Sequence, residues 1–170
     1  MTGPAIIEAI QKKFSSDCIE AKTDIAQPWV LVKSERILEV ARFLKDSPEL
    51  SFDFLRLIAG VDLKDSLEVV YSLFSYAHEH EITVRCRVTR ESPNLSSVAS
   101  VWSAADWHER EAYDLVGVVF DGHPDLRRLL LPDDWEGHPL RKDYKEKDQY
   151  NGVSTTRPYL TGMPDLPTLP

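Results

Sequence analysis

The sequence predicts an α+β fold, a two-layer domain with a mainly antiparallel four-stranded sheet and helices on one side. Residues 67–76 and 82–89 are strand-like runs joined by a short polar loop, as in a β-hairpin. The predicted order is helix, two strands, helix, a short element, two strands and further helices. Periodicity ends after residue 144, and four prolines follow. We therefore expect one domain over residues 1–144 and an extended proline-rich tail over 145–170, ordered only along a partner.

The first part of the chain is predicted to contribute two helices and two strands. Residues 4–15 and the segment between Ser34 and Ser47 carry apolar residues at helical spacing. Residues 19–25 alternate between apolar and polar side chains, which indicates a strand with one wet face. Residues 29–32 are continuously apolar, as expected of a strand that is buried on both sides.

The middle of the chain adds the hairpin and two shorter elements. Residues 52–59 are apolar on most sides and predict a short helix, with a strand as the alternative. In the second hairpin strand, Arg85 and Arg87 are expected to face outward. The inward residues of that strand are predicted to be Ile82, Val84, Cys86 and Val88. Residues 96–105 show helical spacing of apolar side chains and predict another helix.

Composition excludes several classes of protein. The chain has 170 residues, a net charge of -8 and a pI near 5.1, whereas nucleic-acid-binding proteins carry a basic face. No apolar run approaches the roughly 18 residues of a membrane span, and residues 1–14 lack a signal-peptide pattern. We therefore expect a soluble protein made in the cytosol, with no direct membrane span and no nucleic acid partner.

The sequence contains no motif of a resident cofactor. Cys18 and Cys86 are the only two cysteines, and an iron–sulfur cluster normally takes four thiolates. Neither a dinucleotide-binding glycine motif nor a P-loop is present in the sequence. We expect no cofactor in this chain.

Residues 106–144 are unusually rich in charged and aromatic side chains, and hold three of the five histidines. A helix is predicted at the start of this segment, with Asp106 as N-cap, Glu109 as the reciprocal arm of a capping box and Gly117 as the left-handed stop. Arg110 and Asp114 are expected to pair one turn apart. Glu109 falls on the apolar side of this helix, so its carboxylate must be capping, paired or protonated.

A metal site is the enzymatic alternative for this segment. The side chains that could approach one another are His108, Glu111, His123, Asp125 and His138. The zinc motif H-E-x-x-H fails, because Ala112 stands where the second histidine is required. No other ligand spacing of a known metal site is present, so we expect none.

The second half of the segment looks like a recognition surface. Residues 118–120 and 129–131 are apolar and are expected to be buried, while Arg127 and Arg128 stay available as a pair of cations. Arginine forms planar, bidentate contacts with carboxylates, which suit an interface. We therefore expect these two arginines to bind a partner rather than to stabilise the domain.

Three motifs in this order resemble one family. They are E-R-E-x-x-D-L-x-G from Glu109, F-x-G-H-P-D-L-R-R from Phe120, and L-P-D-D-W-x-G-H-P-L-R-K-D-Y from Leu131. The family is the "thirty-kilodalton" subunit, also called the C subunit, of proton-pumping NADH:quinone oxidoreductase, respiratory complex I. The sequence departs from the family at Lys145, where a proline commonly follows K-D-Y.

The resemblance implies a non-catalytic structural and assembly subunit of the peripheral arm of that complex. The expected partners are the hydrogenase-like large subunit and neighbouring iron–sulfur subunits, on the cytoplasmic side of the inner (plasma) membrane. NADH, FMN, iron–sulfur clusters and quinone are expected in the partner subunits. The first alternative is the equivalent subunit of a membrane-bound hydrogenase or ferredoxin-linked complex. The distant alternative is a small metal-dependent hydrolase.

The motif residues are the candidate partner interface. They are Glu109, Arg110, Glu111, Asp114, His123, Arg127, Arg128, Trp135, His138, Arg141, Lys142, Asp143 and Tyr144.

Overall fold

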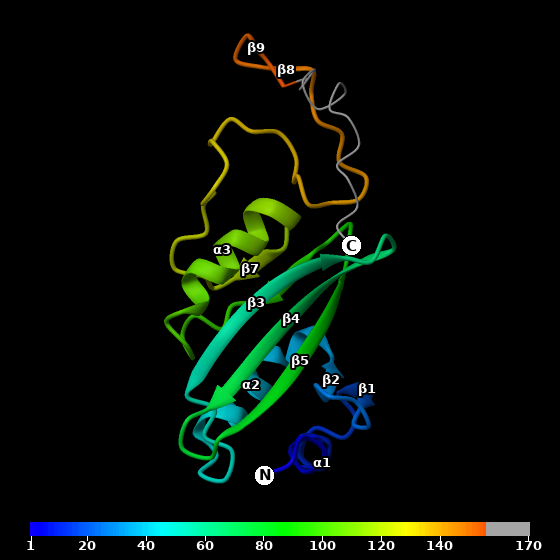
Figure 1. The fold of residues 1–170 in the computed structure, drawn as a ribbon, viewed down its shortest axis with the longest axis vertical. Helices are drawn as coiled ribbons and strands as arrows, with labels where there is room; N and C mark the ends of the chain where they lie inside the picture. Colours follow the sequence, from blue (N-terminus) through cyan, green and yellow to red (C-terminus); the bar gives the residue numbers. More distant parts are fainter. Residues whose placement is uncertain (156–170) are drawn as a thin grey trace, which may run out of the picture.

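The computed structural model describes residues 1–155, which form an elongated α+β molecule (Figure 1). Its elements are α1 (Gly3–Lys13), β1 (Cys18–Lys22), β2 (Trp29–Val32), η1 (Ser34–Arg36), α2 (Ile37–Asp46), β3 (Phe54–Asp62), β4 (Ser66–Ser75), β5 (His80–Thr89), β6 (Asn94–Ser96), α3 (Ala105–Val116), β7 (Val119–Asp121), β8 (Gln149–Tyr150) and β9 (Val153–Ser154). The helices, strands and hairpin predicted for residues 1–89 are present, with one exception. The helix predicted over residues 52–59 is a strand instead.

The main sheet has five strands in the order β1-β2-β5-β4-β3. Every neighbouring pair is antiparallel except β2 and β5, which run parallel. The predicted mainly antiparallel sheet is confirmed, with one strand more than the expected four. The additional strand is β3, so the helix predicted over residues 52–59 is wrong and the strand alternative holds. The residues of β3 pair along most of the strand with β4, which satisfies the backbone groups on that side of β3.

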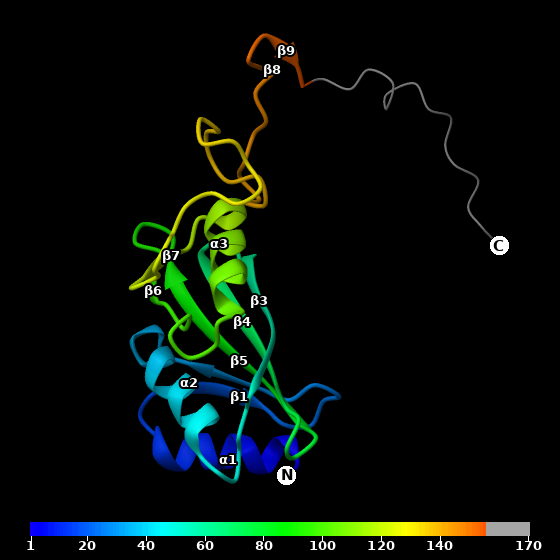
Figure 2. The ribbon, with the colours of Figure 1, turned by 90° about the vertical axis from the view of Figure 1, so that its left-hand side faces the viewer.

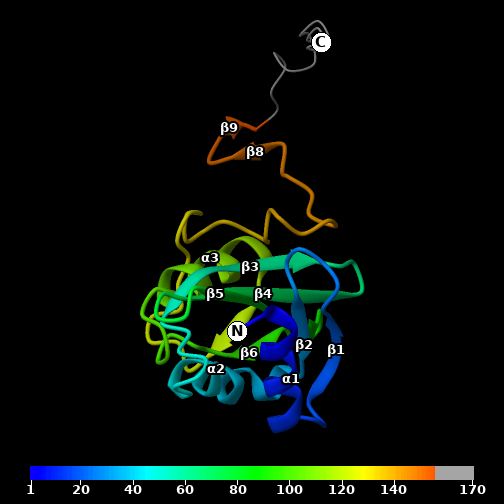
Figure 3. The same cartoon turned by 60° about the horizontal axis from the view of Figure 1, so that its bottom comes forward.

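The helices lie on one face of the sheet and close the core. Apolar residues of α1 and α2, such as Ile10 and Leu44, are buried against Tyr71 and Val84 of the central strands. Figure 3 shows α1 and α2 together on one side of the sheet. In Figure 2, α2 and α3 both lie on the same side of β3. Val116 of α3 approaches β3 so closely that a Cβ built on Gly60 would lie 3.0 Å from it.

The segment predicted as a helix over residues 96–105 has another structure. Its first residue belongs to β6, which pairs in parallel with β7 and buries Leu95 beside Phe120. The following residues form turns, and α3 begins only at Ala105. The prediction failed because Val98 and its neighbours are buried through these turns. Apolar spacing alone cannot distinguish that arrangement from a helical stripe.

The far end of the chain folds back over α3. Gly117 ends α3 with a φ of +83°, which confirms the predicted left-handed stop. Residues 122–144, here named the C-terminal clasp, then extend beyond α3 at the end of the molecule opposite α1 (Figure 2). The tail begins with a short hairpin of β8 and β9, and residues 156–170 lie outside the described part of the chain. Within the tail expected over residues 145–170, this hairpin is the regular structure that the described residues contain.

Gly117→Ala and Gly122→Ala separate backbone strain from crowding. Both glycines have φ near +80°, which costs an alanine about 1–2 kcal/mol. A Cβ at Gly117 would also lie 2.5 Å from the side chains of Arg141 and His138, whereas one at Gly122 meets no atom within 4 Å. We expect Gly117→Ala to lower the free energy of unfolding clearly more than Gly122→Ala in denaturant titrations. Equal losses of unfolding free energy in the two variants would show that Arg141 and His138 leave room for a Cβ at residue 117.

Candidate functional site

The first buried acid of α3, Glu109, fixes the turn that precedes the helix. Its carboxylate accepts hydrogen bonds from Ser97 Oγ at 2.6 Å and from the Val98 N–H at 2.7 Å. Burial raises the pKa of Glu109, while these two hydrogen bonds act in the opposite direction. The predicted capping box is wrong, because Ala104 stands at the N-cap and Asp106 lies inside the first turn. Glu109 therefore caps a different segment from the one that its spacing predicted.

His123 binds the start of the clasp to α3. The Asp125 N–H donates to His123 Nδ1 at 3.0 Å, so the ring proton is on Nε2. Nε2 donates to the carbonyl oxygen of Asp106 at 3.1 Å and lies 3.9 Å from the Glu109 carboxylate. The ring is fully buried. His123 thus has no nitrogen lone pair left for a metal.

The second buried acid, Asp114, holds the middle of the clasp. Its carboxylate accepts the N–H groups of Leu129, Leu130 and Leu131 at 2.7–3.0 Å, together with Arg128 Nη1 at 2.7 Å. Burial alone would raise the pKa of Asp114. The hydrogen bonds from these four donors outweigh burial, and the pKa lies below its usual value. Asp114 is therefore an ionised group enclosed by donors of its own chain.

Arg128 is a structural residue of the clasp, so its predicted availability to a partner is wrong. Besides Asp114, it binds the carbonyl oxygens of Trp135 at 2.8 Å and Gly137 at 3.2 Å, and its side chain is only 16% exposed. Arg127 points outward with 67% of its side chain exposed, and pairs with Asp125. The two neighbouring guanidinium groups thus take opposite directions, because only one fits beside the buried carboxylate.

Arg110 also binds the clasp instead of its predicted partner. Its guanidinium donates to the carbonyl oxygens of Arg127 at 3.3 Å and Arg128 at 3.2 Å. It stacks 5.2 Å from the ring of Trp107. The predicted pair of Arg110 with Asp114 is not formed, because Asp114 is already saturated by the loop after Arg127.

The end of the clasp caps the carboxyl end of α3. His138 Nδ1 donates to the Asp114 carbonyl at 2.9 Å, and the Leu140 N–H donates to the Leu115 carbonyl at 3.0 Å. Arg141 Nε donates to the Val116 carbonyl at 2.6 Å. The last carbonyls of a helix have no partner inside the helix, and basic side chains are favoured there. Burial lowers the pKa of His138, so this ring is held neutral.

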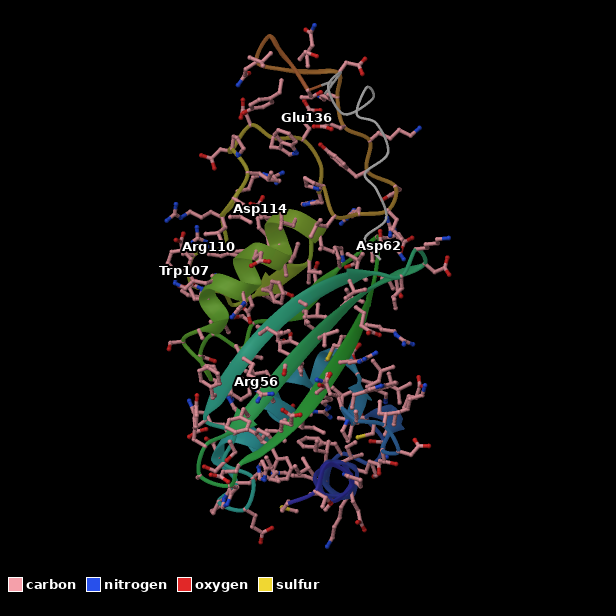
Figure 4. All side chains as sticks on the ribbon, viewed as in Figure 1. Arg56, Asp62, Trp107, Arg110, Asp114 and Glu136 are labelled. Atoms are coloured by element: carbon pink, nitrogen blue, oxygen red, sulfur yellow. The ribbon has the colours of Figure 1, made fainter. Side chains whose placement is uncertain are left out.

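A further anchor ties the clasp to the sheet. Asp62, at the end of β3, accepts the Lys142 N–H at 2.9 Å and Arg90 Nη1 at 2.5 Å. Arg90 also pairs with Asp143 at 2.7 Å. Figure 4 labels Asp114 on α3 and Asp62 at the end of β3, both below the clasp. Sequence reasoning missed Asp62 and Arg90, because neither belongs to a motif and both lie far from Lys142 along the chain.

The clasp exposes apolar side chains, including one that was expected to be buried. Leu130 and Leu140 are 64% and 60% exposed, although the run containing Leu130 was predicted to be buried. Trp107 is 60% exposed, one helical turn before the exposed Glu111. Tyr144 packs on Gly137, and Trp135 lies 5.0 Å from the ring of Tyr150. The predicted site residues are thus gathered at one end of the molecule, and most of them bind each other.

Metal binding has no support in the described residues. Within residues 1–155, no three histidine, cysteine, aspartate or glutamate side chains are grouped so that they could hold a metal ion. Nor does any helix in this range have the length and apolarity needed to cross a lipid bilayer. The fold and the clasp define a small α+β scaffold whose signature residues shape its own carboxyl end.

Comparison with known proteins identifies the family. Residues 30–150 match the family described as "Respiratory-chain NADH dehydrogenase, 30 Kd subunit". The C subunit of NADH-quinone oxidoreductase from Roseiflexus castenholzii is 50% identical over 146 residues, 84% of each chain. The corresponding Chlorobium phaeobacteroides subunit is 39% identical over 88% of this chain and 92% of its own length. The chain therefore belongs to the family of the thirty-kilodalton subunit.

Other relatives differ in length or setting. The C subunit of NADH-quinone oxidoreductase from Chloroherpeton thalassium is 43% identical, and the chain spans only 61% of its length. A trypsin-resistant fragment of Nqo5 matches 72% of this chain and 98% of the fragment, with a TM-score of 0.62 and 33% identity. A chain of the membrane-bound sulfane sulfur reductase, an archaeal respiratory membrane complex, matches 84% of this chain and 85% of its own, with a TM-score of 0.71 and 26% identity.

Arg128→Ala should destabilise the isolated domain, whereas Arg127→Ala should not. Removing Arg128 leaves the buried Asp114 carboxylate without its cation, and breaking a buried pair costs roughly 3–5 kcal/mol. Arg127 pairs with Asp125 on the surface, where water screens the two charges. Losing this ion pair therefore changes the free energy of unfolding little. Urea titration of both variants measures the difference. Equal midpoints would contradict the role of Arg128 in the fold.

Asp62→Asn should remove a pH-dependent part of the stability. The hydrogen bond from Arg90, aided by the Lys142 and Lys64 N–H groups, overcomes burial and lowers the pKa of Asp62 from 3.8 to about 2. A carboxyl whose folded pKa is lowered stabilises the fold above its unfolded pKa, and this contribution is lost as pH falls through the folded value. The stability gap between parent and Asp62→Asn should therefore narrow between pH 3.8 and about 2.

Asp65→Asn is the matched control, because Asp65 is an exposed aspartate in the same β3–β4 turn. Its melting temperatures should follow those of the parent across the same pH range. A gap for Asp62→Asn that stays constant down to about pH 2 would show that Asp62 is not held ionised by its donors.

Proposed function

We propose that the chain is a structural and assembly subunit of the peripheral arm of NADH:quinone oxidoreductase, which transfers electrons from NADH to quinone coupled to proton translocation. The observation that carries this proposal is the orientation of the clasp. Its motif groups point inward to Asp114, Asp62 and the end of α3, while Leu130 and Leu140 point into solvent. Large apolar side chains held outward on a fixed loop suit a protein–protein interface.

The partners follow from the family. We assign the clasp to contact with the hydrogenase-like large subunit, and the rest of the domain to neighbouring iron–sulfur subunits. Exposed members of the predicted interface, such as Glu111 and Arg127, would lie at the polar rim of this contact. The inward-facing members act indirectly, because they hold the clasp in shape.

We assign the electron-transfer chemistry to the partners, so the chain alone carries no catalytic step. NADH, FMN, iron–sulfur clusters and quinone would be held by other subunits. Two observations support this assignment. Cys86 is buried in the core, and burial raises the pKa of its thiol, which disfavours the thiolate that a cluster requires. Cys18 is half-buried, and its pKa is also raised by burial.

The proposed position is peripheral, on the cytoplasmic side of the inner (plasma) membrane. The chain would be held there through the complex. Its acidic charge of -8 is unfavourable for direct binding to anionic lipid, which supports attachment through other subunits.

Leu140→Asp tests the function through copurification. A new carboxylate at a desolvated apolar contact has no partner, so we expect at least tenfold less of the large subunit to copurify with the tagged chain. Membranes of the variant strain should lose NADH:quinone reductase activity in proportion. The melting temperature of the isolated chain should stay near that of the parent, because Leu140 is largely exposed.

Ile19→Asp is the matched control. Ile19 is exposed to the same extent as Leu140, but lies on β1, away from the clasp. This variant should copurify with as much of the large subunit as the parent does. The proposal fails if Leu140→Asp assembles equally well, or if the tagged chain copurifies with a hydrogenase or a sulfur reductase in place of the NADH-oxidising subunits.

A further inference from the structure

A small pocket opens beyond the clasp, between the turn at Trp135 and the hairpin of β8 and β9. It has about 40 Å³ of free space. A water molecule needs on the order of 10–15 Å³ by this measure, so the pocket has room for a few waters or one small planar group. Figure 4 labels Glu136, on the pocket wall, at the end of the molecule above α3.

Aromatic rings form much of the wall. The rings of Trp135 and Tyr150 lie 5.0 Å apart and are tilted by 45°, so they form an open angle instead of a closed stack. Tyr144 contributes a third ring, fixed against Gly137. The face of an aromatic ring carries partial negative charge and attracts cations, most strongly at tryptophan.

Acidic side chains surround the same space. Asp134 accepts the Tyr150 hydroxyl at 2.5 Å, and Glu136 pairs with Lys147 at 2.6 Å. Glu146 also lines the pocket, and in residues 1–155 it has neither a hydrogen bond nor an ion pair. Three carboxylates and one ammonium group therefore line the pocket, and one carboxylate has no partner among the described residues.

The indole of Trp135 supplies a donor without an acceptor. Its Nε1 is buried, and no acceptor lies within hydrogen-bond distance in the described structure. Buried polar atoms without a partner are rare in folded proteins, and each one calls for an explanation. Because this atom is shielded from solvent, an acceptor of another molecule cannot reach it directly, and its N–H signal serves as a reporter of changes in the pocket wall.

We propose that this pocket binds an arginine side chain of a neighbouring subunit. The guanidinium lies against the faces of Trp135 and Tyr150 and donates to Glu146. Arginine fits better than lysine, because its guanidinium is planar, weakly hydrated and rich in donors. The assignment deepens the proposed function and rests on it, because that function supplies the neighbouring subunit that carries the arginine.

The test uses the full chain labelled with ¹⁵N and the indole N–H signal of Trp135, assigned with Trp135→Phe. N-acetyl-arginine amide should shift this signal saturably, whereas N-acetyl-citrulline amide, its neutral analogue, should not. Glu146→Gln should weaken the arginine probe at least threefold. The control Glu111→Gln changes an exposed carboxylate outside the pocket and should leave binding unchanged. Equal shifts with both probes, or unchanged binding to Glu146→Gln, would overturn the proposal.

The cation that already lines the pocket, Lys147, is the competing occupant. The variant Lys147→Gln should bind the probe like the parent. If only this variant binds, Lys147 fills the pocket in the parent and the proposal is wrong.

The pocket and the function can fail separately. An unshifted Trp135 signal in a chain that still copurifies with the NADH-oxidising subunits overturns the pocket alone. A shifted signal in a chain that does not copurify with them overturns the proposed function alone.

Discussion

The arrangement of the carboxyl end depends on one buried carboxylate, that of Asp114. An ionised group can be removed from water only if its environment replaces the lost hydrogen bonds, and here four donors from residues 128–131 do so. Because three of them are consecutive backbone N–H groups, the loop has one conformation that satisfies the charge. Arg128 then extends the constraint to the carbonyls of Trp135 and Gly137.

The same constraint explains why a strongly charged segment presents apolar side chains to solvent. Each inward-facing ion of the clasp satisfies a helix end, a backbone turn or another ion, so the charges determine shape. The leucines between these ions have no inward space left, and Leu130 and Leu140 remain outside. A motif dense in arginine and aspartate thus builds an apolar surface, which is the reverse of what its composition indicates.

The features that follow from local rules could be predicted from the sequence. The hairpin of β4 and β5 and the stop at Gly117 were of this kind, because strand alternation and a left-handed glycine are fixed by neighbouring residues. The family could also be predicted, because each of its three motifs is an unbroken run of residues in the sequence. Residues 52–59 could not be settled, since both faces of β3 carry apolar residues and no alternation marks a strand. The partners of the charged groups could not be read from spacing either. Asp114 has Arg110 one turn away, yet it binds a loop 14 residues further along, a choice that follows from the assembled fold.

The parallel pairing of β2 with β5 has a consequence for the order in which the chain folds. β3, β4 and β5 are neighbours in sequence and form a meander from short-range contacts. Val30 must instead find Val84, on the last strand of that meander, before β1 can join the sheet and α1 can cover it. Closing so long a loop is slow compared with forming a hairpin. We therefore expect the amino-terminal third of the molecule to be added to a preformed meander, although it is synthesised first.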